Sequence, residues 1–203
     1  MNEKIKEYWE NRAKENTDSI QTTTNDIYLR KLEIKTIVKI LNQLELTEDT
    51  EILDVGCGDG FSTINIAKKV QKGKFTGIDY SSNMIQNANK LKHSLDFQNR
   101  IKFLVGNVIE LDAILETKLV DVIITDRCLI NLQTLELQKK AINQIAKHIK
   151  KGGYYICVEN FVEEQENLNT VRKELELSEI PIRWHNLFFK EKEFTKIINN
   201  EFK

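Results

Sequence analysis

Cysteine and proline are scarce in this chain, and its cysteines are far apart. The 203 residues contain 3 Cys and 1 Pro. Cys57, Cys128 and Cys157 form no Cys-x-x-Cys pair, and their number is odd. This usage argues against a disulfide framework and for a reducing compartment, so we expect a cytoplasmic protein.

Long apolar runs and an excess of one charge are also missing. No stretch of about 18 apolar residues occurs, so we expect no membrane span. The N-terminal stretch MNEKIKEYWENRAKEN is charged throughout, unlike a secretory leader. Lys and Arg number 30 against 31 Asp and Glu, a formal net charge of −1. Without the usual basic excess, neither nucleic acid nor a membrane is an expected partner.

What the chain does contain is an alternation of short apolar strands and helical patterns. When strands alternate with helices along the chain, the strands pair in parallel and the connections between them are right-handed crossovers. We therefore predict an α/β fold with a doubly wound, mostly parallel sheet, whose ligands bind beyond the carboxyl ends of the strands. The predicted strands are 52–55, 74–79, 101–105, 120–126 and 154–159, and the helices between them are 61–70, 82–94 and 133–149.

The chain is predicted to form a single domain over residues 1–203. Its parts are N-terminal helices over 1–45, a core over 51–160, and an insertion with a C-terminal helix over 161–203.

Three local patterns refine this plan. Residues 17–25 predict a Ser/Thr/Asn-rich loop between a helix at 2–16 and a second helix. The KKGG stretch at 150–153 predicts a helix stop, because glycine adopts the left-handed conformation readily. Residues 201–203 have the pattern of a strand start, so either the sheet is small or its last strands are absent from this chain.

A glycine-rich loop follows the first predicted strand. EILDVGCGDGF, residues 51–61, places Gly56, Gly58 and Gly60 where the backbone can approach a ligand without Cβ clashes. A dinucleotide fingerprint would need a further glycine where Phe61 stands, and no Gly-Lys-Ser/Thr follows as in a P-loop. A nucleotide-dependent oxidoreductase is therefore disfavoured.

The segment Asp54-Val55-Gly56-Cys57-Gly58-Asp59-Gly60 resembles motif I of class I S-adenosylmethionine (SAM)-dependent methyltransferases. Further landmarks of that family follow in order at 74–79, 105–108, 121–126 and 151–154. The resemblance covers about residues 26–160. It implies a Rossmann-like fold, SAM as the cofactor and S-adenosylhomocysteine (SAH) as its product.

The resemblance also implies roles for individual residues. Asp79 would hold the ribose hydroxyls, and Asn107 would accept a hydrogen bond from the adenine, with a turn-forming Asn as the alternative. An N-terminal helix would form a lid, although aromatic residues at helical spacing also serve packing. Arg30 would reach the methionine carboxylate unless it is a solvated arginine. The cofactor-binding candidates are Asp54, Gly56, Cys57, Gly58, Asp79, Tyr80, Met84, Asn107, Val108, Asp126, Arg127, Tyr8, Trp9 and Arg30.

The residues that bind and activate the methyl acceptor are predicted from less specific patterns. A sulfonium methyl donor is already activated, so neither a metal nor a covalent nucleophile is expected, but a hydroxyl acceptor usually needs a general base. His185, within RWHNLFF at 183–189, is the first candidate because it titrates near neutral pH, with a structural histidine as the alternative. Glu159 is the second. The substrate-binding candidates are Asn131, Asn160, Arg172, Trp184 and Asn186.

This region is similar to small-molecule methyltransferases of bacterial surface-polysaccharide and sugar-modification pathways. The similarity implies a small polar acceptor, phosphorylated or nucleotide-linked, such as a capsule or polysaccharide precursor, methylated on oxygen or nitrogen. Two alternatives stay open: an RNA or protein methyltransferase, and a non-catalytic SAM-binding partner subunit. A homodimer is open as well.

Overall fold

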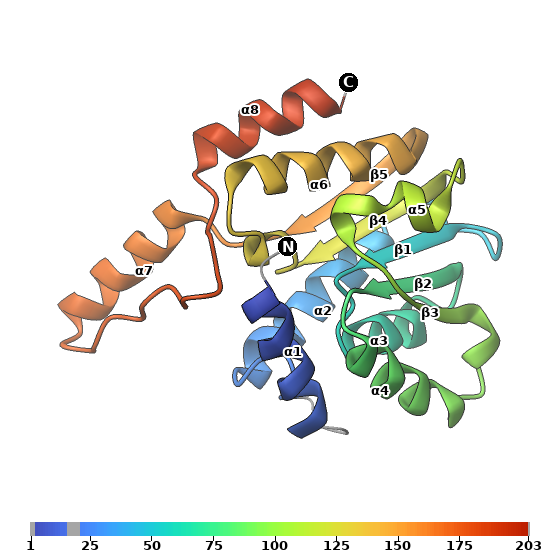
Figure 1. Ribbon diagram of the computed structural model, residues 1–203, viewed down its shortest axis with the longest axis horizontal. Helices are drawn as coiled ribbons and strands as arrows, with labels where there is room; N and C mark the ends of the chain where they lie inside the picture. Colours follow the sequence, from blue (N-terminus) through green and yellow to red (C-terminus); the bar gives the residue numbers. More distant parts are fainter. Residues whose placement is uncertain (1–2, 16–20, 203) are drawn as a thin grey trace.

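Five parallel strands form one sheet between two layers of helices (Figure 1). The computed structural model describes residues 3–15 and 21–202. The strand order is β3-β2-β1-β4-β5, which confirms the predicted α/β fold with a parallel, doubly wound sheet. The strands are β1 Glu51–Val55, β2 Lys74–Asp79, β3 Ile101–Val105, β4 Val120–Asp126 and β5 Ile149–Val158.

The carboxyl ends of all five strands meet at one edge of the sheet. Val55 pairs with Ile78 of β2 and Thr125 of β4, and Asp126 pairs with Val158 of β5. The strand order reverses at β1, so the glycine loop that follows β1 lies at the topological switch point. A crevice forms there because the two neighbouring crossovers leave toward opposite faces.

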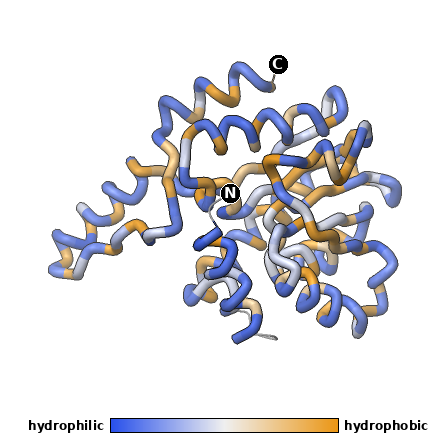
Figure 2. The backbone as a smooth tube through the Cα atoms, in the orientation of Figure 1, coloured by the Kyte–Doolittle hydropathy of each residue, from blue (hydrophilic) through white to orange (hydrophobic). Residues whose placement is uncertain are grey.

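Each face of the sheet carries its own hydrophobic core. Helices α2 Ile27–Leu41, α3 Phe61–Val70 and α4 Ser82–His93 cover one face, where Ile37, Ile66 and Phe75 are buried. Helices α5 Asp112–Leu115, α6 Leu135–His148 and α8 Glu191–Glu201 lie on the other (Figure 1). Hydrophobic colour concentrates on the strands, whereas the outer helices are largely hydrophilic (Figure 2). A sheet buried on both faces needs such continuous apolar strands.

Two segments extend beyond this three-layer core. Helix α1 Glu3–Glu15 packs beside α4. Helix α7 Val162–Glu174 projects from the core, and the chain runs back along it toward α8 (Figure 1). We call residues 162–188, α7 with its return segment, the arm.

Two local predictions were wrong. The KKGG stretch does not end a helix, because it lies inside a strand. Helix α6 ends at His148, and β5 begins at Ile149 and contains both glycines. The positive φ of Gly152, 79°, is accommodated where the β4–β5 register shifts, between Val120 and Val122. At the other site, Glu201 ends α8, so it starts no strand, and residue 203 lies outside the described part.

Residues 2 and 16 of the first predicted helix, and 17–20 of the loop after it, also lie outside the described residues. None of the helices in the described ranges combines the length and apolar composition that crossing a bilayer requires.

Candidate functional site

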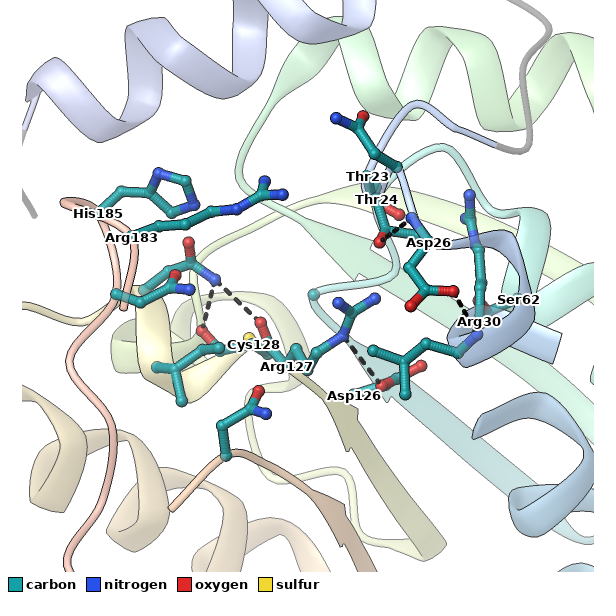
Figure 3. Close-up of a pocket in the computed structure, with 18 of the residues that line it drawn as sticks. Thr23, Thr24, Asp26, Arg30, Ser62, Asp126, Arg127, Cys128, Arg183 and His185 are labelled. Atoms are coloured by element: carbon teal, nitrogen blue, oxygen red, sulfur yellow. Dashed lines mark hydrogen bonds and ion pairs between the residues drawn. The ribbon is translucent and has the colours of Figure 1, made fainter. Parts of the chain in front are cut away.

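A cavity of about 1020 Å³ opens at the carboxyl edge of the sheet. Figure 3 shows Arg183 and His185 on one side of it and Thr23, Thr24 and Arg30 on the other. The cavity brings together predicted residues from segments far apart in sequence. The predicted residues that line it are Trp9, Arg30, Asp54, Gly56, Cys57, Gly58, Asp79, Tyr80, Met84, Asp126, Arg127, Asn131, Asn160, His185 and Asn186.

The glycine loop needs glycine for reasons within the protein itself. Gly56 and Gly58 have φ values of +80° and +55°, which side chains rarely adopt. A Cβ on Gly56 would lie 2.5 Å from Sγ of Cys128, and one on Gly58 would lie 2.8 Å from Cγ2 of Thr23. Both glycines also line the cavity, so a ligand there meets bare backbone.

Asp79 is held at the end of β2 by two backbone donors. The amide of Gly58 donates to its Oδ2 at 3.0 Å, and the amide of Ser81 donates to its Oδ1 at 2.8 Å. Burial raises the pKa of this carboxyl to about 6. A carboxylate has about four acceptor positions, so Asp79 can still accept from two ribose hydroxyls. The residue therefore fits the role predicted for it.

Asp54, near the end of β1, and Cys57, in the glycine loop, are both buried. The hydroxyl of Thr63 donates to Asp54, which links β1 to the first turn of α3. Burial raises the pKa of Asp54 to about 7. Burial also raises the pKa of the Cys57 and Cys128 thiols well above the usual range, which leaves both as inert packing groups.

Arg30 is buried in an ion pair. Its side chain is 2% exposed, and its Nη2 lies 2.8 Å from Oδ1 of Asp59. The guanidinium also lies over the ring of Phe61, 4.6 Å from the centroid. The alternative of a solvated arginine is therefore wrong, and Arg30 lines the cavity beside the glycine loop.

A second ion pair lies at the end of β4. Nε of Arg127 lies 3.0 Å from Oε1 of Glu33 and 4.0 Å from Oδ1 of Asp126. Glu33 Oε2 and Asp126 Oδ1 are buried without a hydrogen-bond partner among the described residues. Burial, and then the charge of Asp126, raises the pKa of Glu33 to about 7. Asp126 lines the cavity and Glu33 does not, so of these two carboxylates only that of Asp126 is placed to meet a ligand.

Three predicted cofactor residues do not line the cavity: Asn107, Val108 and Tyr8. Oδ1 of Asn107 accepts from the amide of Ile109 at 3.3 Å, so Asn107 is the turn-forming residue of the alternative interpretation. It borders a separate hollow of about 350 Å³, and Tyr80 lines both this hollow and the main cavity. Val108 is buried in the core under α6. Neither side chain is brought to the main cavity.

Helix α1 contacts both α4 and the turn after β4, and its Trp9 lines the cavity. Glu10 accepts from the amides of Ser82 and Asn83 at the start of α4, at 3.0 and 3.3 Å. At the other side, Nε1 of Trp9 donates to Oδ1 of Asn131 at 3.1 Å. Tyr8 does not line the cavity; its ring stacks on His185 instead.

His185 lies within an aromatic cluster at the cavity wall. Its ring centroid is 4.7 Å from that of Tyr8, 5.5 Å from that of Trp9 and 5.3 Å from that of Trp184. Its Nδ1 is buried without a hydrogen-bond partner in the described ranges. Burial, and then Arg183, lowers the pKa of the imidazole below 6.5. The ring is therefore neutral at pH 7 and can accept a proton.

Three other predicted residues do not line the cavity. The carboxylate of Glu159 accepts from the amides of Cys128, Leu129 and Ile130 at 3.1, 3.0 and 3.3 Å, so it caps the turn after β4. Nε of Arg172 donates to the carbonyl of Ser178 within the arm. Trp184 is half exposed and packs edge-on against His185. We therefore carry forward neither a catalytic role for Glu159 nor substrate roles for Arg172 and Trp184.

The cavity also contains residues that the sequence did not single out for binding. The Thr-Thr-Thr-Asn run before Asp26, the N-cap of α2, was a usable signal, because binding residues are found disproportionately on loops. The unpredicted lining residues include Thr23, Thr24, Asp26, Ser62 and Gln165. Within residues 3–15 and 21–202, no cluster of three or more His, Cys, Asp or Glu side chains could hold a metal ion.

Comparisons with known proteins agree with this geometry. Residues 46–201 match the family described as a methyltransferase domain. The demethylmenaquinone methyltransferase of Staphylococcus aureus is 29% identical over 122 residues, which are 60% of this chain and 47% of that protein. The chain thus spans about half the length of the curated relatives it matches.

Solved structures show the same fold. Magnesium protoporphyrin IX methyltransferase from Synechocystis, with bound SAH, has a TM-score of 0.72 at 18% identity, covering 97% of this chain and 87% of that one. A SAM-dependent methyltransferase from Methanosarcina mazei has a TM-score of 0.61 at 22% identity, covering 80% and 82%.

A third neighbour belongs to a complex of the Haloferax volcanii Trm112 activator with a putative methyltransferase. Its TM-score is 0.63 at 18% identity, and the match covers 97% of this chain and 75% of that one. The family match over residues 46–201, with a glycine loop and a buried acid at the switch point, places the chain in the methyltransferase domain family of class I SAM-dependent enzymes.

Proposed function

We propose that the chain transfers a methyl group from SAM to an oxygen or nitrogen of a small polar acceptor bound in the same cavity. The observation that carries this proposal is that one cavity joins two sets of residues. Gly58 and Asp79 lie on the cofactor side, and Asn131, Asn160 and Asn186 lie on the other. Alignment of two reactants in one enclosed space is the main requirement of methyl transfer.

The cofactor side fits SAM by shape and by charge. SAM, when bound, supplies a methyl group activated by its sulfonium. Asp79 offers acceptor positions for the ribose, and the loop at Gly56 and Gly58 presents bare backbone. The carboxylate of Asp126, which lines the cavity, would balance the ammonium.

The acceptor side combines amides with a cationic group. Asn160, Asn186 and Gln165 offer neutral donors and acceptors, while Arg183 offers positive charge. This set suits a phosphorylated or nucleotide-linked sugar, such as a capsule or polysaccharide precursor, because arginine binds phosphate in a bidentate manner. The relatives named above act, by their names, on demethylmenaquinone and on magnesium protoporphyrin IX. Because these acceptors differ, the choice of acceptor has to be argued from the cavity of this chain.

His185 is our candidate base for a hydroxyl acceptor. Its ring lines the cavity, is neutral at pH 7, and has a buried Nδ1 without a partner among the described residues. We propose that Nδ1 holds the proton that the acceptor hydroxyl loses. The packing of α1 over the cavity would exclude water from the same space.

Two measurements test the proposed function. Thermal shift with SAH and with NAD separates a methyltransferase from a nucleotide-dependent oxidoreductase, because a ligand stabilises only the protein that binds it. Turnover of labelled SAM is then measured across sugar phosphates, nucleotide-linked sugars, amines and RNA. We expect stabilisation by SAH and methylation of a phosphorylated sugar. Methylation of RNA alone would overturn the acceptor class. SAH binding without any turnover would indicate a non-catalytic SAM-binding subunit.

A further inference from the structure

We propose that the arm binds a hydrocarbon tail carried by the acceptor, whose polar head enters the cavity. This inference rests on the proposed function, because it takes the cavity as the acceptor site. It adds a second part to the acceptor: a chain of CH₂ or isoprenoid groups that leaves the cavity along α7.

The arm carries an unusual concentration of exposed apolar side chains. Val171 and Leu175 are 53% and 64% exposed. Contiguous apolar surface of this kind on a folded protein usually marks a binding site. The large apolar side chains exposed along the arm are Leu168, Val171, Leu175, Leu177, Ile180, Ile182, Trp184 and Leu187.

This apolar surface continues directly from the cavity. Leu168 and Ile180 both line the cavity and are exposed beyond it. Leu168, Val171 and Leu175 are spaced by three and four residues, so they share one face of α7. A tail attached to a head in the cavity would therefore meet apolar side chains spaced by three and four residues along α7. Figure 2 shows hydrophobic segments along α7 and along the segment that returns beside it.

The return segment of the arm is held against α7 by side-chain hydrogen bonds. Nε2 of Gln165 donates to the carbonyl of Ile180 at 2.8 Å, and the amide of Ile180 donates to Oδ1 of Asn169 at 2.9 Å. Nε of Arg172 donates to the carbonyl of Ser178 at 2.7 Å. These bonds fasten the return segment to α7. The apolar side chains are thus presented on a preorganised scaffold, which lowers the entropy cost of binding.

A second group of exposed apolar residues lies beside the cavity, on α2. Tyr28 and Leu29, in the first turn of α2, line the cavity and are 79% and 37% exposed. Leu32, one turn on from them, is 60% exposed. Apolar residues thus adjoin the cavity on two elements, which is what a chain leaving it requires.

Charge favours a single bound molecule over an anionic bilayer. The tip of the arm carries Glu174, Glu176 and Glu179 beside Lys173, and all four are exposed. Anionic membrane surfaces recruit clusters of Lys and Arg, not acidic tips.

The test measures binding of two probe series to the full chain saturated with SAH. One series is ethyl, octyl and dodecyl phosphate, and the other is ethyl, octyl and dodecyl glucoside, all below their micelle-forming concentrations. Titration calorimetry gives the affinities. A fully buried CH₂ group contributes about fourfold in affinity. We expect at least about tenfold tighter binding of octyl than of ethyl in both series.

The variant Val171→Gln/Leu175→Gln removes two apolar side chains that do not line the cavity, and glutamine keeps good helix propensity. We expect it to lose most of the gain with chain length while its binding of the ethyl compounds is unchanged. Leu119→Gln is the control, because Leu119 is 43% exposed just before β4, outside the arm.

Three outcomes would overturn the tail site: no gain with chain length, a gain that the arm variant retains, or no binding of either series. A homodimer in light scattering that the arm variant dissociates would also overturn it, because a second copy would then cover the apolar stripe. The phosphorylated acceptor of the proposed function predicts tighter binding of the phosphates than of the glucosides. Equal binding of the two series, with the chain-length gain intact, would count against that acceptor and not against the tail site.

Discussion

Nε1 of Trp9 donates a hydrogen bond of 3.1 Å to Oδ1 of Asn131, 122 residues further along the chain. Nδ2 of the same amide donates to the carbonyl of Arg127 at 2.9 Å. Helix α1 is thereby tied to the turn after β4, next to the Arg127–Glu33 ion pair. The amide of Asn131 thus links two groups, the indole of Trp9 and the carbonyl of Arg127, at the boundary between the cofactor and acceptor sides.

Trp9→Phe removes this bond while keeping an aromatic ring. We expect affinity for SAH to fall about fivefold, because one hydrogen bond of about 1 kcal/mol fastens the helix over the cavity. Titration calorimetry measures the affinity. Tyr154→Phe, on an exposed position of β5, is the matched control and should bind SAH as the native chain does. Equal affinities for all three proteins would show that α1 does not close over the cofactor.

Asp79→Ala removes the carboxylate that we assign to the ribose. We expect affinity for SAH to fall at least about tenfold, since hydrogen bonds to a charged acceptor contribute about 1.5–3 kcal/mol each. Asp49→Ala removes an exposed aspartate paired with Lys74 and should leave the affinity unchanged. Undiminished binding by Asp79→Ala would contradict the assignment.

Asp54 makes stability depend on pH. Burial raises its pKa from 3.8 to about 7, so the folded state holds a proton that the unfolded state releases between these values. Its contribution to the free energy of unfolding is fully present below pH 3.8 and is lost as pH rises through 7. Asp54→Asn cannot ionise. The free energy of unfolding, measured with urea, is compared between Asp54→Asn and the native chain from pH 4 to pH 8. The difference should shift in favour of the variant by up to about 4 kcal/mol, at about 1.4 kcal/mol per pKa unit. A constant difference across this range would refute the expectation.

His185→Gln tests the base. We expect turnover of a hydroxyl acceptor to fall by a factor of about 100 or more, with SAH binding intact, because the variant cannot take up the proton. In the native chain, turnover should drop on acidification only below pH 6.5, since burial lowers the pKa of His185. If turnover of His185→Gln still drops on acidification in the same pH range, the drop belongs to another titrating group.

Glu159→Ala separates the cap from a catalytic role. Three backbone amides would lose their acceptor, so we expect the free energy of unfolding to fall by about 2 kcal/mol or more. Glu159→Gln retains an acceptor oxygen and should recover part of this stability together with turnover. Should Glu159→Gln fold stably yet lose turnover as His185→Gln does, the catalytic interpretation would stand after all.

The sheet and most of the cofactor side were predictable because their signals are local. Strand–helix alternation sets a parallel sheet through the handedness of crossovers, and the strand ends then bring Asp54, Asp79 and Asp126 to one edge. The KKGG error has a local cause as well. A glycine with positive φ is compatible with a helix stop and with an irregular strand, and only the pairing with β4 distinguishes them.

The roles of polar residues at the acceptor edge depended on neighbours that the sequence does not place. Glu159 and Asn107 follow strands, as functional residues do, but nearby amides occupy their oxygens. Whether a carboxylate meets backbone donors or a ligand is decided by how the following turn folds back on it.

By itself, the sequence determined the fold class, the glycine loop and the buried acid at the end of β2, because each follows from residues within one strand–loop–helix unit. Only the tertiary structure decided that Tyr8 and Trp9 enclose His185, and that Glu33 pairs with Arg127. It alone revealed the apolar stripe that leads from the cavity along α7. The contacts of His185 and of Arg127 join segments far apart in sequence, and the packing that sets them leaves no local signal in either segment.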